Sequence, residues 1–364
     1  MIRRHFIRQM AAASAGLAIA PSLSAIPFLP KKKLGVALVG LGYYSTYLLA
    51  PALQKTKNCY LAGIVTGSPE KATEWQKKYG IKEKNTYNYQ NFDQIANNPD
   101  IDVVYIVLPN SMHMEFTVRA AAAGKHVWCE KPMALTAAEC NVMIRACAEN
   151  KVKLSIGYRM QHEPNTQEII RYGREKTFGK VQMVTVTAGF KESREGHWHT
   201  IKAMGGGAMY DMGVYPLNAA RYVVGEEPIA VTAVQKVYRP EVFVGIDESM
   251  SFQLEFPGGA VANCATSLGV NLSNYLMVSC DKGWYKLEPF SNYSGITGVN
   301  SEGKTLDQLV SIPEPQQQIR QMENDARSIL SDQAVLVPGE EGMRDIRILE
   351  GIYKAAKDGC RVVL

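Results

Sequence analysis

The chain has 364 residues, of which 46% are apolar and 21% charged, with 30 glycines and 17 prolines. This composition excludes a collagen-like, low-complexity or mostly disordered chain, and the length fits two domains with a sizeable core. Arg3, Arg4 and Arg8 supply three of the 40 basic residues, so the rest of the chain, with 35 acidic residues, is close to neutral. That balance gives no electrostatic reason to expect nucleic acid or an anionic membrane as a partner. Seven cysteines without a CxxC pair indicate neither a disulfide framework nor a zinc site.

The first 25 residues have the order of an export signal. A basic stretch from Arg3 to Arg8 precedes an apolar stretch from Met10 to Ala20 and a few small residues. As a helix the apolar stretch would span about 16 Å, too short for a hydrocarbon core of about 30 Å. Paired arginines followed by bulky apolar residues are typical of the twin-arginine signal. We therefore expect a periplasmic protein without a stable membrane anchor, in which residues 26–33 form a linker. The alternative is a basic arm on a cytosolic enzyme.

The next segment predicts a dinucleotide-binding turn. Leu34–Val39 is a continuous apolar run, as expected for a parallel strand covered on both faces. It leads into Gly40-Leu-Gly42 and then into a helical stretch. In that setting Gly40 permits the tight turn, and Gly42 lets the backbone approach a pyrophosphate at the helix N-terminus. The third position of the motif is Ser45, which is small enough for close packing of helix on strand.

Strands and helices continue to alternate up to residue 155. The pattern predicts strands at 61–66, 102–108 and 126–129, and helices at 46–55, 69–79, 112–123 and 136–150. This alternation predicts an N-terminal Rossmann domain over residues 34–155, with a doubly wound parallel sheet.

The end of the second strand bears on the choice of cofactor. An NAD site usually has an acidic residue there, which binds the ribose hydroxyls. The corner from Thr66 to Lys71 instead offers hydroxyl groups and an ammonium, and its first acid is Glu70. Because these groups would attract a 2′-phosphate, NADP is favoured, with NAD as the alternative.

Residues 156–338 are mostly β in pattern and predict a second, α+β domain for the substrate. Strands are expected at 181–190, 230–238, 250–256, 260–268, 275–280 and 284–287, and helices at 165–175, 215–224 and 316–330. This predicts a large, mostly antiparallel open sheet, whose open face favours a homo-oligomer, a dimer or a tetramer. A last helix, 339–358, is expected to pack back on the first domain.

Two separated segments carry groups for proton transfer. Glu130-Lys131-Pro132 follows a parallel strand, at the edge where open α/β sheets bind ligands. The second segment runs from a triple glycine through Asp211 to Tyr215, and in a helix these two side chains share one face. Lysine, aspartate and tyrosine facing a nicotinamide would suit alcohol oxidation, because a nearby cation favours the phenolate. In the alternative reading, Asp211 caps a helix, Tyr215 lies in the core and Lys131 pairs with Glu130.

Other chemistries have less support. His197 and His199 have the spacing of a metal-binding pair, but no third ligand lies at a useful spacing, so we expect no metal site. The serines lack a GxSxG setting, so nothing indicates acyl transfer.

Taken together, these motifs resemble the family of glucose–fructose oxidoreductase, inositol dehydrogenases and other sugar dehydrogenases. The similarity extends from Leu34 to Val363. It rests on the Gly40 turn, Leu108-Pro-Asn-Ser-Met-His113, Cys129-Glu-Lys-Pro-Met133 and the stretch from the triple glycine to Tyr215. The segments Arg221–Pro228 and Pro338–Met343 point to the glucose–fructose branch.

The resemblance implies roles for individual residues. Lys131 would orient the substrate and stabilise the phenolate of Tyr215, and the Lys131–Pro132 bond would be cis. Tyr215 would be the general acid/base at a sugar hydroxyl, and Asp211 would hold either the substrate or Tyr215. The residues implied in cofactor binding are Gly40, Gly42, Tyr44, Thr66, Lys71, Tyr89, Asn110, His113, Glu130, Lys131, Arg159 and Trp198.

The function expected from the sequence is that of an exported NADP-dependent sugar oxidoreductase. Hydride would pass between C1 of an aldose and a tightly bound nicotinamide, and a second sugar is a candidate acceptor. One alternative is a glycosidase-type enzyme that uses NAD(P) for transient oxidation. Another is a non-catalytic sugar-binding or sensory protein.

Overall fold

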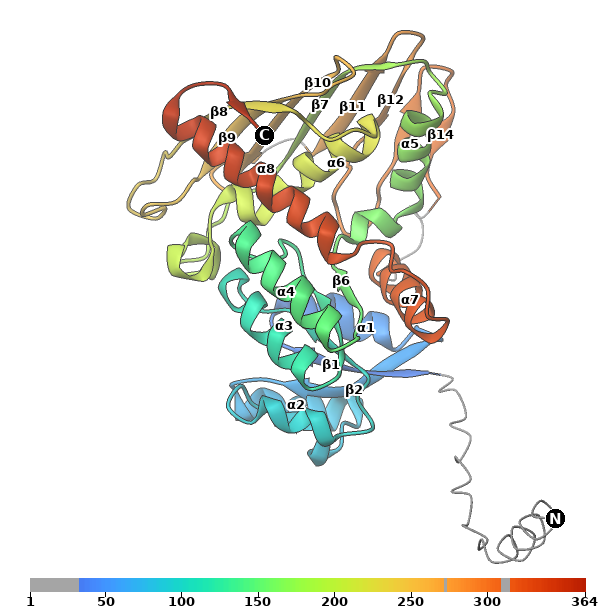
Figure 1. The fold of residues 1–364 in the computed structure, drawn as a ribbon, viewed down its shortest axis with the longest axis vertical. Helices are drawn as coiled ribbons and strands as arrows, with labels where there is room; N and C mark the ends of the chain where they lie inside the picture. The colour runs from blue at the N-terminus through green and yellow to red at the C-terminus, as the bar shows by residue number, and fades with distance from the viewer. Residues whose placement is uncertain (1–32, 272–273, 309–314) are drawn as a thin grey trace, which may run out of the picture. The chain divides into compact units, whose positions relative to one another are not determined.

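The computed structural model describes residues 33–271, 274–308 and 315–364. The predicted export signal, and all of the predicted linker except its last residue, lie outside the described residues. The described chain forms a six-stranded and a nine-stranded sheet with helices packed against both (Figure 1).

The first sheet is parallel throughout and has the strand order β3-β2-β1-β4-β5-β6. Its strands are β1 (Leu34–Val39), β2 (Cys59–Val65), β3 (Thr86–Tyr87), β4 (Val103–Ile106), β5 (His126–Cys129) and β6 (Leu154–Ile156). The order reverses between β1 and β4, and such a switch point is where doubly wound sheets bind ligands. The predicted Rossmann sheet is therefore confirmed, with β3 and β6 as short additional edge strands.

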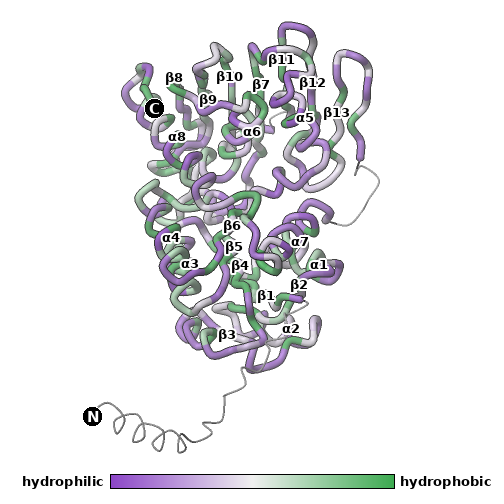
Figure 2. Tube along the Cα trace, turned by 45° about the vertical axis from the view of Figure 1, so that its right-hand side comes forward, coloured by the Kyte–Doolittle hydropathy of each residue, from purple (hydrophilic) through white to green (hydrophobic). Residues whose placement is uncertain are grey.

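Both faces of this sheet are covered, which explains why its strands are apolar without alternation. Val36 and Leu38 of β1 belong to one buried cluster, and Ala37 and Val39 belong to another. The helices around the sheet are α1 (Ala50–Leu53), α2 (Pro69–Tyr79), α3 (His113–Ala122), α4 (Ala137–Glu149) and α7 (Gln316–Leu330). α1, α2 and α7 contribute to the first cluster, and α3 and α4 to the second. In Figure 2 the strands β4, β5 and β6 are accordingly hydrophobic.

The second sheet has the order β14-β13-β12-β11-β7-β10-β9-β8-β15. Its strands are β7 (Val181–Gly189), β8 (Ala230–Lys236), β9 (Ser249–Glu255), β10 (Val261–Ser267), β11 (Tyr275–Cys280), β12 (Trp284–Leu287), β13 (Gly298–Asn300), β14 (Thr305–Leu306) and β15 (Val362–Val363). β7 and β10 pair in parallel, and the other pairs are antiparallel. This confirms the predicted mostly antiparallel sheet, which β13, β14 and β15 make larger than expected.

Three helices link the second sheet to the first domain or cover its inner face. α5 (Pro164–Glu175) and α6 (Val214–Val224) bury apolar residues in the same cluster as the inward-facing residues of β7, β9 and β10. Along β9 the burial alternates, with Met250, Phe252 and Leu254 inside, as a sheet covered on one face requires. The long helix α8 (Gly339–Asp358) contacts α4 and β6 as well as β8.

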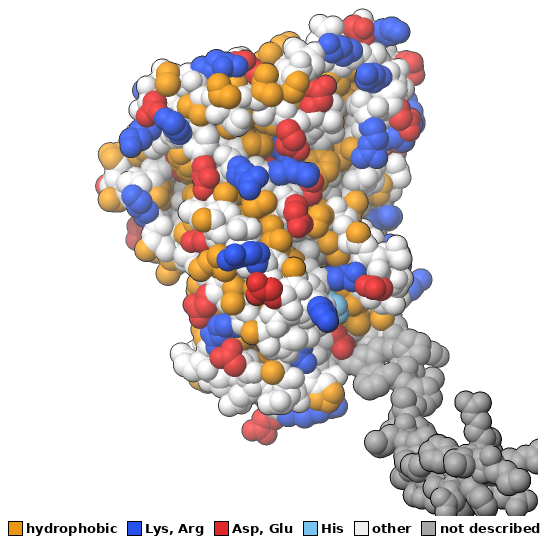
Figure 3. Space-filling view, viewed as in Figure 1, with side chains coloured by type: hydrophobic (Ala, Val, Ile, Leu, Met, Phe, Trp, Pro, Cys, Tyr) orange, Lys and Arg blue, Asp and Glu red, His pale blue; other side chains and the backbone are white. Residues whose placement is uncertain are grey.

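Two global properties of the described residues bear on possible partners. None of the helices within 33–271, 274–308 and 315–364 is long and apolar enough to cross a membrane. On the face drawn in Figure 3, basic and acidic side chains are interspersed rather than gathered by sign, in keeping with the near-neutral charge of the body.

Candidate active site

A cleft of about 1040 Å³ lies at the carboxyl ends of the parallel strands. Gly40, Thr66 and Glu130, which line it, follow β1, β2 and β5 directly. Its opposite wall comes from the second sheet and its loops, including Asp211 and Tyr293. The volume is at the upper end of what small-molecule sites have, which suits a dinucleotide together with a small substrate.

The turn after β1 has the features that a pyrophosphate requires. Gly40 has φ +91°, and a Cβ there would lie 2.3 Å from the carbonyl oxygen of Val107, so only glycine fits. At Gly42 a Cβ would meet no atom within 4 Å and would stand in the open cleft. Ser45 is fully buried, and its hydroxyl donates a hydrogen bond to the carbonyl of Gly40 at 2.6 Å. The serine thus braces the turn in the place of the third glycine.

The helix that follows the turn begins with a π-helical segment, Ser45–Leu49, before α1. Pro51 has no amide hydrogen, so it cannot form the ordinary bond to the residue four positions earlier, and the turn before it is widened. The open backbone at Gly42 and the start of this helix fit a dinucleotide phosphate.

At the end of β2 the cleft is lined by hydroxyls and one ammonium. Thr66, Ser68, Lys71 and Tyr89 line it. Ser68 caps α2, and the Nζ of Lys71 donates a hydrogen bond to the carbonyl of Leu41 at 3.2 Å, which holds the ammonium against the Gly40 turn. Among the described residues no carboxylate is part of the cleft lining at this corner, but the Ser68 hydroxyl donates to the carboxylate of Glu70 just outside it at 2.9 Å.

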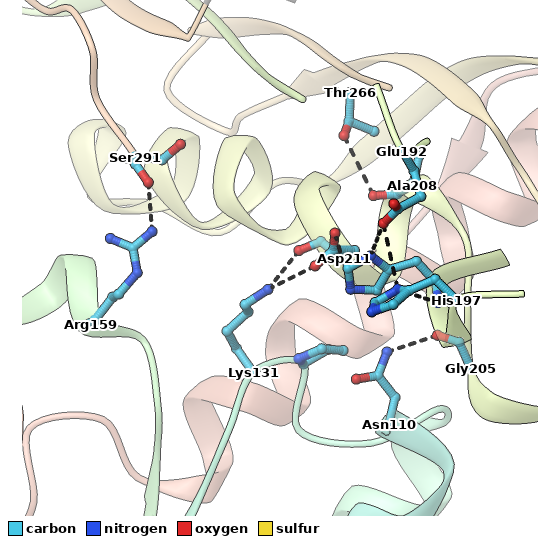
Figure 4. Close-up of polar contacts among 12 residues, drawn as sticks. Asn110, Lys131, Arg159, Glu192, His197, Gly205, Ala208, Asp211, Thr266 and Ser291 are labelled. Carbon is cyan, nitrogen blue, oxygen red and sulfur yellow. Dashed lines mark hydrogen bonds and ion pairs between the residues drawn. The ribbon is translucent and has the colours of Figure 1, made fainter. Parts of the chain in front are cut away.

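Lys131, Asp211 and Tyr215 all line the cleft where the two domains face each other. Figure 4 shows Lys131 pointing toward Asp211. The Nζ of Lys131 donates a hydrogen bond to the carbonyl of Asp211 at 2.8 Å and lies 3.4 Å from its carboxylate Oδ1. It also lies 4.8 Å from the centre of the Tyr215 ring. The Lys131–Pro132 bond is cis, as the resemblance implied.

The arrangement differs from the alternative reading of the same residues. Asp211 lies in a π-helical turn, Met209–Gly213, and makes no capping hydrogen bond there. Tyr215, in the first turn of α6, is 6% exposed and belongs to the buried apolar cluster, as that reading expects, but it also lines the cleft. Glu130 accepts a hydrogen bond from the Tyr105 hydroxyl at 2.6 Å, so Lys131 is free to pair with Asp211 instead.

Charges in the centre of the cleft stabilise one another. Burial alone would lower the pKa of Lys131, but the groups of Tyr215 and Asp211 outweigh it and raise that pKa. Burial likewise favours protonation of Asp211, yet the charges on His199 and Lys131 lower its pKa overall. Lys131 is therefore an ammonium and Asp211 a carboxylate. Behind them, burial raises the pKa of Glu130 to about 7.

The other residues that the sequence places at the cofactor line the cleft with one exception. Tyr44, Asn110, Arg159 and Trp198 lie in its walls together with those above. His113 does not: it is fully buried, and its two ring nitrogens lie 2.9 Å from the carbonyls of Leu108 and Pro132. In this structure His113 does not line the cleft, and its ring instead holds together the two loops that carry Asn110 and Lys131.

Two contacts connect the walls of the cleft. Asn110 donates a hydrogen bond to the carbonyl of Gly205 at 2.8 Å, joining the first domain to the triple-glycine segment. Arg159 donates to the carbonyl of Ser291 at 2.6 Å and to that of Asn292 at 3.1 Å.

Sequence analysis missed Tyr293. The Arg159 guanidinium lies 4.6 Å from the centre of its ring, and the ring of Tyr44 lies 5.7 Å away. Desolvation of its hydroxyl in the cleft raises the pKa of Tyr293 to about 12, although the residue as a whole is 42% exposed, so the hydroxyl stays protonated and can donate a hydrogen bond. Tyr293 belongs to an irregular loop between β12 and β13, which carries no motif or periodicity that would have singled it out.

The expectation that His197 and His199 lack a third partner is wrong. The chain folds back after β7, so Glu192 brings a carboxylate oxygen to both, and the possible ligand atoms of the three residues lie within 4.8 Å of one another. Such a trio can bind a divalent ion. Here, however, Arg194 donates from Nε to one oxygen of Glu192 at 2.8 Å and forms an ion pair with the other. The cluster is therefore an ion-paired hydrogen-bond network rather than an open set of ligands.

Comparison with known proteins agrees with this geometry. Residues 34–158 match the GFO_IDH_MocA family, described as an oxidoreductase family with an NAD-binding Rossmann fold, and residues 166–286 match the GFO/IDH/MocA C-terminal domain. A D-xylose 1-dehydrogenase [NADP(+)] of Haloarcula marismortui is 28% identical over 88% of this chain and 90% of its own length.

Among solved structures, the aldose–aldose oxidoreductase of Caulobacter crescentus, complexed with glycerol, is 41% identical with a TM-score of 0.86. The alignment covers 91% of this chain and 100% of that one. A levoglucosan dehydrogenase in complex with NADH and levoglucosan, 21% identical, has a TM-score of 0.81 over 91% of this chain and 99% of its own and shares the fold. The dinucleotide turn, the paired sheets and these relatives together show that this chain belongs to the GFO/IDH/MocA family of oxidoreductases.

Proposed function

We propose that this protein is an exported NADP-dependent sugar oxidoreductase that transfers hydride between C1 of an aldose and a tightly bound nicotinamide. The observation that carries the proposal is the meeting of Lys131, Asp211 and Tyr215 in the cleft that also contains the Gly40 turn. Oxidation of aldoses is also what the name of the Caulobacter relative describes, and that relative is 41% identical to this chain.

The chain's own residues would handle the proton of the reaction. In aldose oxidation the C1–H bond breaks with its electron pair leaving as hydride, the C1 hydroxyl loses its proton, and a lactone carbonyl forms. A bound nicotinamide supplies the hydride acceptor. Tyr215 takes the hydroxyl proton, and the Lys131 ammonium 4.8 Å from its ring stabilises the phenolate that acts as the base. Asp211 keeps Lys131 in place through its carbonyl and carboxylate.

The corner after β2 supports NADP as the cofactor. Hydroxyls of Thr66 and Ser68 and the ammonium of Lys71 face the cleft where the adenosine ribose would lie. These groups complement a 2′-phosphate, whereas NAD sites place a carboxylate there. The NADP(+) in the name of the Haloarcula relative agrees with this choice.

Export and cofactor retention belong to the same proposal. The twin-arginine route carries folded proteins, so the cofactor would be bound before export. Since the periplasm has no supply of NADPH, a retained cofactor needs a second carbonyl substrate for its reoxidation, and we propose a second sugar, bound in the same cleft, as that substrate. We also propose a homo-oligomer, because the outer face of the second sheet exposes Met183 and Val234.

The test begins with protein purified without added cofactor. Nicotinamide absorbance should be present, and mass spectrometry of the molecules released on denaturation should detect NADP. An aldose together with a ketose or aldose acceptor should be converted to aldonolactone and alcohol. Tyr215→Phe should abolish this turnover while the cofactor remains bound. Cleavage of an aryl glycoside without net oxidation would instead favour the glycosidase-type enzyme, and bound nucleotide without any turnover would favour a binding protein.

Localisation and assembly are tested separately. Fractionation of cells should recover the wild type from the periplasm, and replacement of Arg3 and Arg4 by lysine should leave the protein in the cytoplasm. Light scattering of the purified protein should give a mass above that of one chain. A wild type found only in the cytoplasm would refute export, and a monomer would refute the homo-oligomer.

A further inference from the structure

The two carboxylate oxygens of Asp211 have different surroundings. Oδ1 lies 3.4 Å from the Nζ of Lys131. Oδ2 is buried and has no hydrogen-bond partner in the part of the chain that the structure describes. The Nε2 of His199 lies 3.7 Å from it, which is too far for a direct hydrogen bond. Buried carboxylate oxygens are nearly always hydrogen-bonded, so Oδ2 calls for a partner from outside the chain.

The imidazole of His199 is held in one orientation. Its Nδ1 lies 2.8 Å from Oε2 of Glu192, a carboxylate that is only 2% exposed. Its ring lies edge-to-face against Trp198, with the ring centres 4.2 Å apart. Because Nδ1 faces a carboxylate, it carries a proton and donates it. Nε2 is on the side of Asp211, and His199 lines the cleft.

Two carboxylates flank this ring, with Glu192 at Nδ1 and Asp211 at Nε2, so a proton on Nε2 would be directed toward Asp211. Of the cations nearby, Arg194 pairs with Glu192 and its Nη2 also lies 3.5 Å from Nδ1 of His199, and Lys131 pairs with Asp211 on its other oxygen. His197, the remaining titratable neighbour, is neutral, because burial and the charges of His199 and Arg194 lower its pKa to about 4.

We propose that Nε2 of His199 and Oδ2 of Asp211 together bind one hydroxyl of the sugar, distinct from the hydroxyl that reacts at Tyr215. An oxygen placed between two atoms 3.7 Å apart can lie within hydrogen-bond distance of both. The hydroxyl would donate to Oδ2 and accept from Nε2–H, which matches the two capacities of a hydroxyl group. A deoxy sugar, with hydrogen in place of that hydroxyl, would leave Nε2 and Oδ2 buried without hydrogen-bond partners. The pair therefore selects for a sugar that carries the hydroxyl.

This inference rests on the proposed function, because it requires a sugar in the cleft. It adds a residue, His199, that neither the sequence motifs nor the proton-transfer set includes. Glu192 is then a positioning residue that acts through His199 and does not touch the substrate.

The test is a double-mutant cycle between enzyme and substrate. A series of monodeoxy analogues of the preferred aldose is assayed with the wild type and with His199→Asn, whose amide can keep the contact to Glu192 but does not reach Asp211. With the wild type, one deoxy position away from C1 should lower kcat/KM about 10- to 100-fold. With the parent sugar, kcat/KM of His199→Asn should be lower than that of the wild type by a similar factor. Changing the substrate of His199→Asn to that same deoxy analogue should lower kcat/KM by less than about a further threefold.

Matched variants separate this role from a structural one. His199→Gln, whose amide reaches the place of Nε2, should recover part of the discrimination. His197→Asn, in the same cluster but paired with Glu192 and not with Asp211, should keep the full penalty for the deoxy analogue. Retained nicotinamide absorbance and an unchanged thermal midpoint verify the fold of each variant.

Three results would overturn the inference, and they are distinguishable. If every deoxy analogue lowers kcat/KM by the same factor in His199→Asn as in the wild type, no sugar hydroxyl contacts His199. The gap between His199 and Asp211 then holds only water. If activity is lost to a chelator and restored by zinc, the cluster of Glu192, His197 and His199 holds a metal instead. If the wild type turns over no sugar at all, the proposed function fails and the inference with it.

Discussion

Removing the ammonium of Lys131 is the most direct perturbation of the candidate site. In Lys131→Met the side chain keeps its length and loses its charge, so the phenolate of Tyr215 loses a cation 4.8 Å from its ring centre. At an effective dielectric constant of about 20, a unit charge at that distance contributes about 3.5 kcal/mol. If this stabilisation acts on the proton-transfer step, kcat/KM should fall roughly 300-fold.

The assay is steady-state turnover of the preferred aldose with a saturating acceptor. Lys77→Met, on the exposed face of α2, is the matched control and should leave kcat/KM unchanged. Because Asp211 loses its partner in Lys131→Met, the retained nicotinamide absorbance of each protein must be compared first. A folded, cofactor-loaded Lys131→Met enzyme with kcat/KM within about tenfold of wild type would refute the role of the ammonium, since the Coulomb energy at this distance would then be absent.

Three further predictions concern the cofactor corner, pH and packing. Lys71→Ala should weaken NADP binding to the apoenzyme by about 10- to 100-fold and leave NAD binding nearly unchanged, as measured by titration calorimetry. An equal loss of affinity for both nucleotides would contradict the role of the ammonium. Burial raises the folded-state pKa of Asp325 to about 7, above its unfolded value of about 3.9, so this group makes stability fall as pH rises from about 4 to 7. Asp325→Asn should reduce that fall in thermal midpoints measured across this range, and an unchanged slope would contradict it. Gly157→Ala places a Cβ 2.7 Å from Oε1 of Glu130. This clash should lower the free energy of unfolding, measured by urea denaturation, by about 1–3 kcal/mol. An unchanged free energy of unfolding would mean that the buried carboxylate of Glu130 can move.

Much of the first domain follows from patterns within a few residues of each other. The continuous apolar run of β1 and the boundaries of α2 were predicted as the structure has them, because two-sided burial and helix caps leave local signals. Short strands such as β3 and β15 were missed, since two residues carry no periodicity and pair only because a neighbouring strand is present. The helix α7 was predicted, but its place in the cluster behind β1 depends on contacts with residues more than 200 positions away in the chain.

The sequence by itself determined the dinucleotide turn. It also showed that Lys131 and the Asp211 segment have the chemical groups to work together in proton transfer. The residues concerned belong to motifs whose spacing follows from the geometry of a strand, a turn or a helix. Only the tertiary structure decided that His113 points away from the cleft, that Tyr293 enters it, and that Glu192 orients His199 toward Asp211. These outcomes depend on where irregular loops come to rest against distant elements, and a loop's path is set by packing and hydrogen bonding across the whole fold rather than by its own residues.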